Sequence, residues 1–232
     1  MPDLTDRKYL IPVVVITLGL YVCGLSSQYK PTPDSSEYVG TAKSLVQGQG
    51  LQFNHVRGSI FPPLFALSMA GVTRLLGQDE LPILAMKLLE AVLAVLLAVG
   101  TWRLARKFVS ANLARVTGVL VLTNITVFQH TMYILSDMLY ACLTVWSIVL
   151  LEESQTDGKG KWIGGLLLAS LAWLTRSVGL TLAGAIFVWL LTSTRTKPGW
   201  RKYALAVLAP VFVALPWLWW RLSFPTGGVG YM

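Results

Sequence analysis

Long apolar runs separated by short polar and basic segments dominate this chain. A membrane-spanning helix needs about 20 mainly apolar residues, and helices are one of the two structures that satisfy every backbone group inside lipid. The pattern therefore predicts an all-α, polytopic bundle of membrane helices. The apolar runs cover residues 10–25, 60–76, 81–104, 113–128, 132–151, 162–174, 178–191 and 203–222.

A polar stretch follows the first apolar run and has a helical pattern of its own. Between residues 35 and 47, Tyr38, Ala42 and Leu45 recur at the spacing of one helix face. Gly48 then ends the periodic segment. We expect an interfacial helix here, within a first outer loop that extends over residues 26–80.

The run at 60–76 is the doubtful span, because it is short, opens on Pro62-Pro63 and contains Arg74. If it crossed the membrane, three basic clusters would fall outside, against the positive-inside rule. If it is re-entrant or interfacial, those clusters and the basic N-terminus all lie inside. We therefore predict about seven transmembrane helices, a cytoplasmic N-terminus and an uncleaved first helix. The basic clusters are residues 103–107, 159–161 and 195–202.

Composition supports a membrane protein and excludes two other classes. The 232 residues are 54% hydrophobic and 13% charged, whereas a soluble domain carries about 25% charged residues. Intrinsic disorder requires low hydrophobicity and is excluded by the same numbers. The net charge of +8 does not indicate a nucleic-acid partner, because the cations cluster between apolar runs.

The predicted orientation gathers most remaining ionisable residues on the outer side. Charged groups at membrane depth are costly, and those present usually face a cavity and serve function. Only two histidines are present, which excludes a histidine-rich metal site. The residues predicted at this depth are Lys87, Glu90, Asp137 and Arg176. The predicted topology places Asp34, Glu37 and Arg57 on the same outer side.

Two of the acidic candidates also have a purely structural interpretation. Asp34 followed by Glu37 has the spacing of a capping-box variant, so Asp34 could cap the interfacial helix. Asp137 precedes an apolar helix and could cap it in the same way. Neither interpretation removes the chemistry, because the helix dipole keeps such a carboxylate ionised and able to act as a base.

The basic candidates have structural alternatives as well. Lys87 and Glu90 are three residues apart, a spacing that favours an intrahelical ion pair. Arg176 separates two apolar runs and could be an arginine that extends from the membrane into water. These alternatives stay open at the level of sequence.

Several motifs, in order along the chain, resemble the GT-C class of membrane glycosyltransferases. That class includes protein O-mannosyltransferases, lipid A aminoarabinose transferases and the bacterial RgtA/B/C/D-like family. Ser177 stands where relatives commonly have proline, and Lys87 where they tend to have arginine. The matching motifs are Asp34-x-x-Glu37-Tyr38, Gly48-Gln49-Gly50-Leu51, Phe61-Pro62-Pro63-Leu64, the basic turn 103–108, Leu135-Ser136-Asp137 and the segment 174–180.

The resemblance implies a polyprenyl-phosphate-linked sugar as donor and a hydroxyl acceptor on a lipid, glycan or protein. It implies transfer with inversion, with Asp34 as the base. Arg57, Lys87 and Arg176 would bind the donor phosphate. Glu37 and Asp137 would orient the acceptor or, with Asp34, hold a divalent metal such as magnesium or manganese, although fixed cations could replace a metal.

The resemblance also implies where the protein is located and how much of a family member the chain represents. The chain is expected in a prokaryotic inner or plasma membrane, with its active face outside. Relatives usually continue through further spans, so residues 1–232 are expected to form a single module that is a truncated copy or a minimal core. The alternative function is a non-catalytic membrane protein, such as a lipid-linked sugar flippase, a transporter or an inactive truncated homologue.

Overall fold

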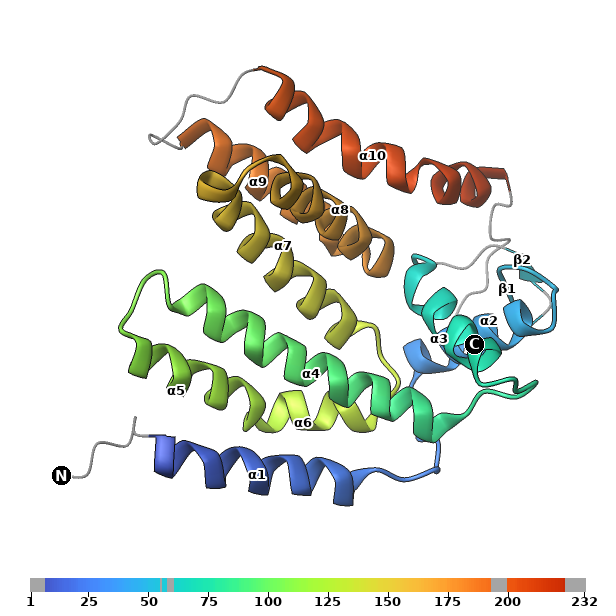
Figure 1. Cartoon of the computed structure of the whole chain (residues 1–232). Coiled ribbons are helices and arrows are strands. Elements are labelled where there is room, and N and C mark those ends of the chain that lie inside the picture. Colours follow the sequence, from blue (N-terminus) through green and yellow to red (C-terminus); the bar gives the residue numbers. More distant parts are fainter. Residues whose placement is uncertain (1–6, 55, 58–60, 193–199, 224–232) are drawn as a thin grey trace.

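The computed structural model describes residues 7–54, 56–57, 61–192 and 200–223 (Figure 1). Within these ranges, the side chains of residues 7–10, 56–57, 156–157 and 200–203 lie outside the description. The described chain is helical apart from one short hairpin, which confirms the predicted all-α bundle. The hairpin joins β1 (Gln52–Phe53) to β2 (Val56–Arg57), with Gln52 opposite Arg57.

The helices follow the apolar runs closely but not at every boundary. The α-helices are α1 (Arg7–Gly24), α2 (Pro33–Val46), α3 (Leu64–Leu75), α4 (Ile83–Ala105), α5 (Ala111–Leu122), α6 (Ile125–Met132), α7 (Asp137–Asp157), α8 (Lys159–Thr175), α9 (Leu180–Thr192) and α10 (Trp200–Ser223), and a 3-10 turn η1 (Ser177–Gly179) joins α8 to α9.

Membrane spans are clearest in α4 and in residues 204–223 of α10, which are long and apolar enough to cross alone. The pair α5 and α6 is a third if its bent path counts as one span. The doubtful run at 60–76 forms only the 12 residues of α3, about 18 Å of helix against a hydrocarbon core of about 30 Å. The count of seven crossings stays a prediction.

One predicted span is broken. The run at 113–128 folds as α5 and α6, whose axes meet at 42°. The break follows from Asn124, whose side-chain oxygen accepts hydrogen bonds from the N–H groups of Thr126 (2.8 Å) and Val127 (3.4 Å). This side chain begins a new helix and competes with continuation of the old one.

The next helix starts later than the apolar run at 132–151 suggests. Tyr133 has an extended backbone, with φ −101° and ψ 153°, and α7 begins only at Asp137. This places the Asp137 carboxylate in the first helical turn. The extended segment also brings Ile134 into a buried cluster with α2, α3 and the start of α4.

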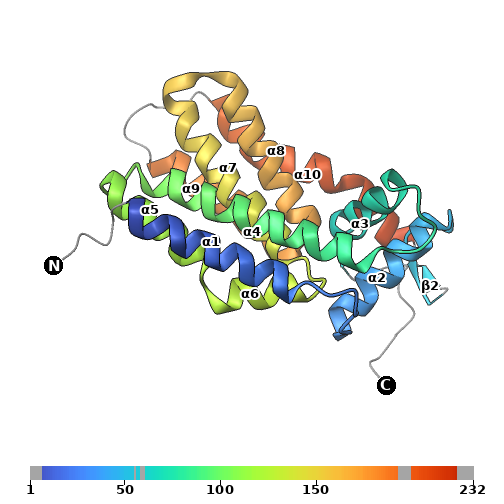
Figure 2. The same ribbon diagram turned by 60° about the horizontal axis from the view of Figure 1, so that its bottom comes forward.

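Three buried clusters hold the helices together. The first cluster joins α1, α4, α5 and α7. The second joins the four consecutive helices α7, α8, α9 and α10. The third packs α2 and α3 against the start of α4. Figures 1 and 2 show the result: α2, α3 and the hairpin lie together at one end of the long helices, where α4 begins and α8 ends.

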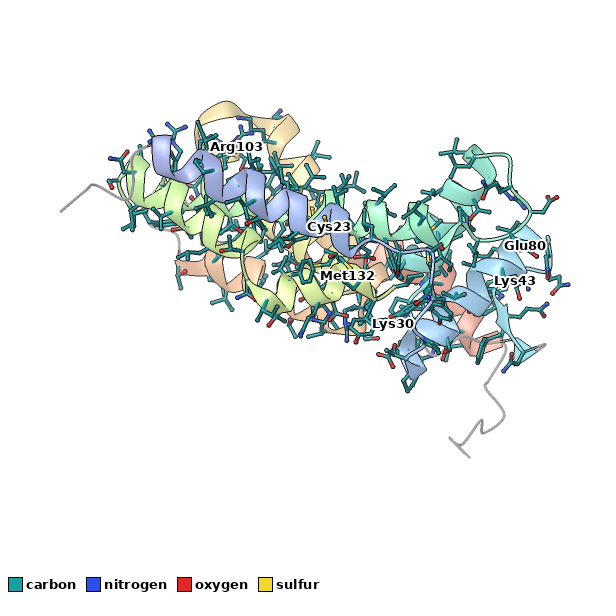
Figure 3. The ribbon with its side chains drawn as sticks, turned by 90° about the horizontal axis from the view of Figure 1, so that it is seen from below. Cys23, Lys30, Lys43, Glu80, Arg103 and Met132 are labelled. Atoms are coloured by element: carbon teal, nitrogen blue, oxygen red, sulfur yellow. The ribbon has the colours of Figure 1, made fainter. Side chains whose placement is uncertain are left out.

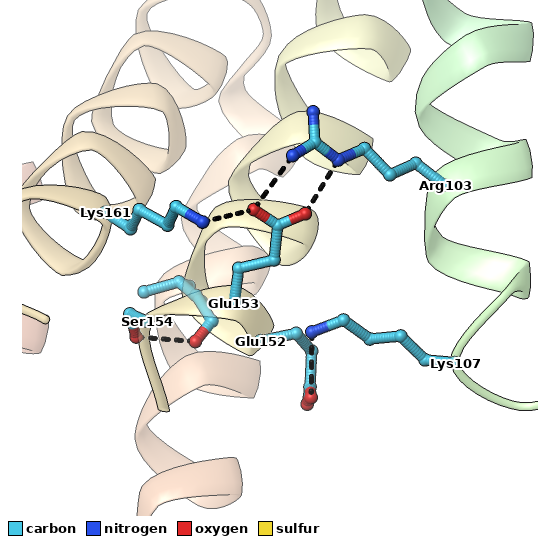
Figure 4. A network of polar contacts seen from close by, with 7 residues as sticks. Arg103, Lys107, Glu152, Glu153, Ser154 and Lys161 are labelled. Atoms are coloured by element: carbon cyan, nitrogen blue, oxygen red, sulfur yellow. Dashed lines mark hydrogen bonds and ion pairs between the residues drawn. The ribbon is translucent and has the colours of Figure 1, made fainter. Parts of the chain in front are cut away.

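An ionic network ties α4, α7 and α8 at the opposite end (Figure 4). Arg103 donates two hydrogen bonds to Glu153 (2.7 and 3.1 Å), and Lys161 pairs with the same carboxylate at 2.9 Å. Lys107 lies 3.9 Å from Glu152. Burial opposes ionisation of Glu153, but the hydrogen bonds and charges of Lys161 and Arg103 outweigh it and lower its pKa. These residues belong to the face predicted to be cytoplasmic.

Candidate functional site

The start of α2 is capped by Thr32. Its hydroxyl accepts a hydrogen bond from the Ser35 N–H at 3.2 Å, and the Ser35 hydroxyl accepts one from the Thr32 N–H at 2.8 Å. Pro33 occupies the first helical turn, where its missing N–H costs nothing. The alternative that Asp34 caps this helix is therefore wrong. Asp34 sits in the first turn of the helix and is half-buried.

Tyr38 lies one turn further along α2 and is only 3% exposed. Its hydroxyl is 2.9 Å from the Ser136 hydroxyl, which immediately precedes α7. The rings of Phe61 and Phe65 pack against it at centroid distances of 5.0 and 5.1 Å. The phenol thus joins α2 to the start of α7 inside an aromatic surround.

The electrostatics of Tyr38 identify its charged neighbours. Burial raises the pKa of the phenol to about 12, while the Ser136 hydrogen bond and the charge of Arg176 act to lower it. The charges of Asp34 and Asp137 act to raise it. Three residues selected from distant parts of the sequence therefore act electrostatically on one phenol. We call Asp34, Tyr38, Ser136, Asp137 and Arg176 the Tyr38 cluster.

Asp137 and Arg176 form an ion pair, with 2.5 Å between a guanidinium nitrogen and a carboxylate oxygen. Both side chains are about one-third exposed, at 36% and 32%. Arg176 follows α8 in an extended conformation, and its carbonyl accepts a hydrogen bond from the Gly179 N–H at 2.8 Å. Arg176 therefore does not simply extend into water. It forms an ion pair that joins the start of α7 to the turn after α8.

Lys87 and Glu90 do not form the intrahelical pair that their spacing favours. The Lys87 ammonium donates to the Ser26 hydroxyl (3.1 Å) and the Gln28 carbonyl (2.7 Å), both in the segment between α1 and α2. Glu90 is 1% exposed, and its carboxylate oxygens lack hydrogen-bond partners. Lys87, itself 2% exposed, would have to exchange these contacts to meet a phosphate.

The remaining predicted site residues are less informative. Glu37 is half-buried on α2, one turn after Asp34. Arg57 belongs to β2 by its backbone, but its side chain lies outside the described residues. The structure therefore gathers Asp34, Asp137 and Arg176, and leaves Lys87 bound to a neighbouring segment.

The donor set fits a divalent metal poorly. Among the described residues, no three histidine, cysteine, aspartate or glutamate side chains come together as a metal-binding group. Asp137, one of the three proposed ligands, is already paired with Arg176. Magnesium is usually bound through one or two carboxylates together with waters and substrate phosphates, so these residues would hold it only jointly with the donor phosphate.

Sequence reasoning missed Tyr38 and Ser136 as parts of the site. In the sequence, Tyr38 is interpreted as one apolar position of the interfacial helix, and Ser136 is noted only as the neighbour of Asp137. A signal was available, since both lie directly beside an acidic candidate. A buried tyrosine generally needs a hydrogen-bond partner for its hydroxyl, but the sequence does not show which partner.

Comparison with known proteins gives the class of the chain. Residues 61–220 match the family model described as dolichyl-phosphate-mannose-protein mannosyltransferase. No curated protein shows significant similarity.

Two solved structures share the fold. ArnT from Cupriavidus metallidurans in the apo state superposes with a TM-score of 0.72 at 19% identity, covering 94% of this chain. The same protein bound to undecaprenyl phosphate gives 0.73 at 21% identity, covering 95%. In both comparisons the match covers 43% of the ArnT chain, so this chain corresponds to less than half of that protein.

Proposed function

Since the chain belongs to the dolichyl-phosphate-mannose-protein mannosyltransferase family, within the GT-C class of membrane glycosyltransferases, we propose that it transfers a sugar from a polyprenyl-phosphate donor to a hydroxyl acceptor. The observation that carries this proposal is the Tyr38 cluster. There Asp34 shares α2 with a buried phenol, and the ion pair of Asp137 in α7 with Arg176 after α8 acts electrostatically on the same phenol. Transfer from a phosphate leaving group needs both a base and a cation.

The donor class is supported by the fold and by the ligand bound in one structure that shares it. ArnT, which shares this fold, was solved bound to undecaprenyl phosphate. A helical bundle in lipid can accept such a tail directly from the bilayer. The partners proposed for the chain are therefore a polyprenyl-phosphate-linked sugar, a hydroxyl-bearing lipid, glycan or protein, and the surrounding membrane lipids.

Asp34 is the proposed base. It would take the proton of the acceptor hydroxyl as that oxygen forms a bond to the anomeric carbon. The bond between this carbon and the phosphate oxygen breaks, and polyprenyl phosphate leaves with the electron pair. Attack opposite the leaving group in one step inverts the anomeric configuration, as it does in inverting glycosidases.

Arg176 is the proposed cation for the leaving phosphate. In the structure its charge is held beside Asp137, and guanidinium groups suit phosphate because they offer a planar set of donors. Arg57 and Lys87 are further proposed phosphate ligands, Lys87 after giving up its contacts to residues 26 and 28. Glu37 and Asp137 are proposed to orient the acceptor.

The reaction is proposed for the outer membrane face. The Tyr38 cluster and the Arg103–Glu153 network occupy opposite ends of the long helices. The positive-inside rule assigns the end with unbalanced basic loops to the cytoplasm, which leaves the cluster outside. The second candidate function, a non-catalytic flippase or an inactive homologue, is favoured only by the fact that the chain matches 43% of ArnT.

Replacement of Asp34 tests the proposed function. In membranes containing the chain and a radiolabelled polyprenyl-phosphate sugar, we expect Asp34→Asn to reduce transfer by roughly 100-fold or more, as loss of a general base does. Asp79→Asn is the matched control, because Asp79 is an exposed acidic residue outside the Tyr38 cluster. Near-normal transfer by Asp34→Asn would refute the assignment. Absence of transfer by the unaltered chain would favour the non-catalytic alternative.

A further inference from the structure

An apolar furrow lies between α1, α4 and α5, at the end of the molecule far from the Tyr38 cluster. Its volume is about 360 Å³. Its walls are aliphatic, with Val14 on α1, Val99 on α4 and Val119 on α5, except where Trp102 and Arg115 contribute. Figure 3 views the molecule from the side on which α1 lies across α5 and α6.

A second cavity lies beside the furrow, along the C-terminal half of α1. It has a volume of about 280 Å³ and is lined by Thr17, Tyr21 and Phe128 among others. Leu122 borders both cavities. The lining of α1 thus extends from residue 11 to residue 21, which is about 15 Å of helix. A narrow apolar space of this length matches an extended hydrocarbon chain better than a compact ligand.

Close packing of α5 on α4 forms the floor of the furrow. A Cβ atom at Gly118 would lie 2.9 Å from the Trp102 Cβ and 3.1 Å from the Ala98 carbonyl oxygen. The two helix backbones therefore approach closely at this glycine. The helix α1 packs less extensively, contacting chiefly α5 and α6, so that the space between it and α4 is left open.

Two arginines at one end of the furrow have no ionic partner among the residues that the structure describes. Arg115 lines the space, and the Arg106 guanidinium lies 5.7 Å from the centre of the Trp102 ring. Across the described residues, no carboxylate lies within ion-pair distance of either arginine. The nearby Arg103, by contrast, is fully engaged with Glu153. The furrow therefore combines an apolar length with unpaired positive charge at one end.

We propose that this furrow binds one acyl chain of an anionic phospholipid, with the headgroup phosphate against Arg115 and Arg106. Charge complementarity selects this occupant: both anionic and zwitterionic phospholipids bring a phosphate, but a zwitterionic headgroup also brings a cation, which the positive charge of the two arginines repels. Under the predicted topology the lipid belongs to the cytoplasmic leaflet. The site is separate from the proposed sugar transfer.

Lipid retention tests this proposal without any enzymatic assay. The chain would be reconstituted in nanodiscs of equal parts phosphatidylglycerol and phosphatidylcholine, released, and examined by native mass spectrometry. We expect phosphatidylglycerol to be retained preferentially. Arg115→Gln should reduce that preference about fivefold, the effect of removing one basic residue near an anionic headgroup. Val119→Trp should fill the furrow and reduce retention of both lipids.

Matched controls separate the furrow from general effects. Lys159→Gln removes an exposed cation from the same end of the molecule. Leu120→Trp adds the same bulk one residue away, at a side chain that is 63% exposed and outside the furrow lining. Both controls should retain phosphatidylglycerol as the unaltered chain does. Equal retention of the two lipids, unchanged retention in Arg115→Gln, or an equal loss in the controls would overturn the proposal.

Discussion

At the scale of single residues, the hydrogen bond between Tyr38 and Ser136 is the contact that joins the two acidic parts of the site. Both residues are almost fully buried, at 3% and 0% exposure. We expect Tyr38→Phe and Ser136→Ala each to lower the free energy of unfolding by about 1 kcal/mol or more, because each leaves a buried hydroxyl unpaired or removes a bond. Thermal unfolding in detergent would measure both effects.

A double-mutant cycle isolates this bond from other effects of the two changes. The combined variant should lower the free energy of unfolding by less than the sum of the two single variants, because the second change removes a bond that is already lost. Thr131→Ala is a control, since its hydroxyl bonds within its own helix to the Phe128 carbonyl and should add independently to Tyr38→Phe. Simple additivity of Tyr38→Phe and Ser136→Ala would contradict the proposed coupling.

The residues of the site were predictable where charge alone selected them. Asp34, Asp137 and Arg176 stood out because ionised groups are rare beside apolar runs, and the structure gathers them. Their partners were not predictable, since pairing across a fold depends on helix placement. Thr32 shows the difference: the capping pattern at Asp34 and Glu37 was present in the sequence, but the helix starts at Pro33 with Thr32 as its cap, two residues earlier than that pattern predicts.

At the scale of elements, the turn between α8 and α9 sets the position of Arg176. A Cβ atom at Gly179 would lie 2.5 Å from the Trp173 nitrogen and 2.6 Å from the Ala172 carbonyl. These are backbone atoms that cannot give way. We expect Gly179→Ala to force the turn away from α8, destabilise the chain by about 1–3 kcal/mol and reduce sugar transfer by displacing Arg176.

Gly184 provides the matched control for this change. It lies in α9, five residues further on, and a Cβ atom there would meet nothing within 4 Å. Gly184→Ala should therefore leave transfer unchanged and stabilise the helix slightly, as alanine does in place of glycine. Thermal unfolding and the transfer assay would be measured on both variants. Tolerance of Gly179→Ala in both measurements would mean that the turn does not position the arginine.

Hydropathy predicted which segments become helices better than where they begin and end. The broken pair α5 and α6 illustrates the reason. Asn124 lies within one apolar run, and a window of about 20 residues averages over it. Its side chain nevertheless accepts two backbone hydrogen bonds and turns the axis by 42°. Hydropathy averaged over a window does not detect one side chain that competes for backbone N–H groups, although that side chain determines where the helix bends.

At the scale of the whole molecule, charge divides the protein into two ends with different roles. At one end Arg103, Lys161 and Glu153 hold helices together in a network of paired charges. At the other end Asp137 and Arg176 of the Tyr38 cluster form an ion pair of their own, with both side chains about one-third exposed. The overall bundle was predictable from apolar periodicity and low charge content. The contact between the ends of α2 and α7 was not, because it requires the tertiary arrangement.

Chemical labelling of single cysteines tests how these two ends face the membrane. Cys23 and Cys142 are the native cysteines, and both would be replaced by serine. We expect Asp79→Cys to react with a membrane-impermeant maleimide in intact cells, because residues 26–80 belong to the predicted outer loop. Lys159→Cys should react only after the membrane is opened, because it follows the turn between α7 and α8 on the predicted cytoplasmic side.

The two positions are well matched, since both side chains are exposed in the structure and differ chiefly in the end of the bundle at which they lie. Labelling after permeabilisation gives the accessible total for each variant. Reaction of Lys159→Cys in intact cells would reverse the orientation and place the Tyr38 cluster in the cytoplasm. The proposed outer-face reaction would then be wrong, whereas the internal geometry of the cluster would stand. We expect Lys159→Cys not to react in intact cells, because an inverted chain would carry its basic loops outside, against the positive-inside rule.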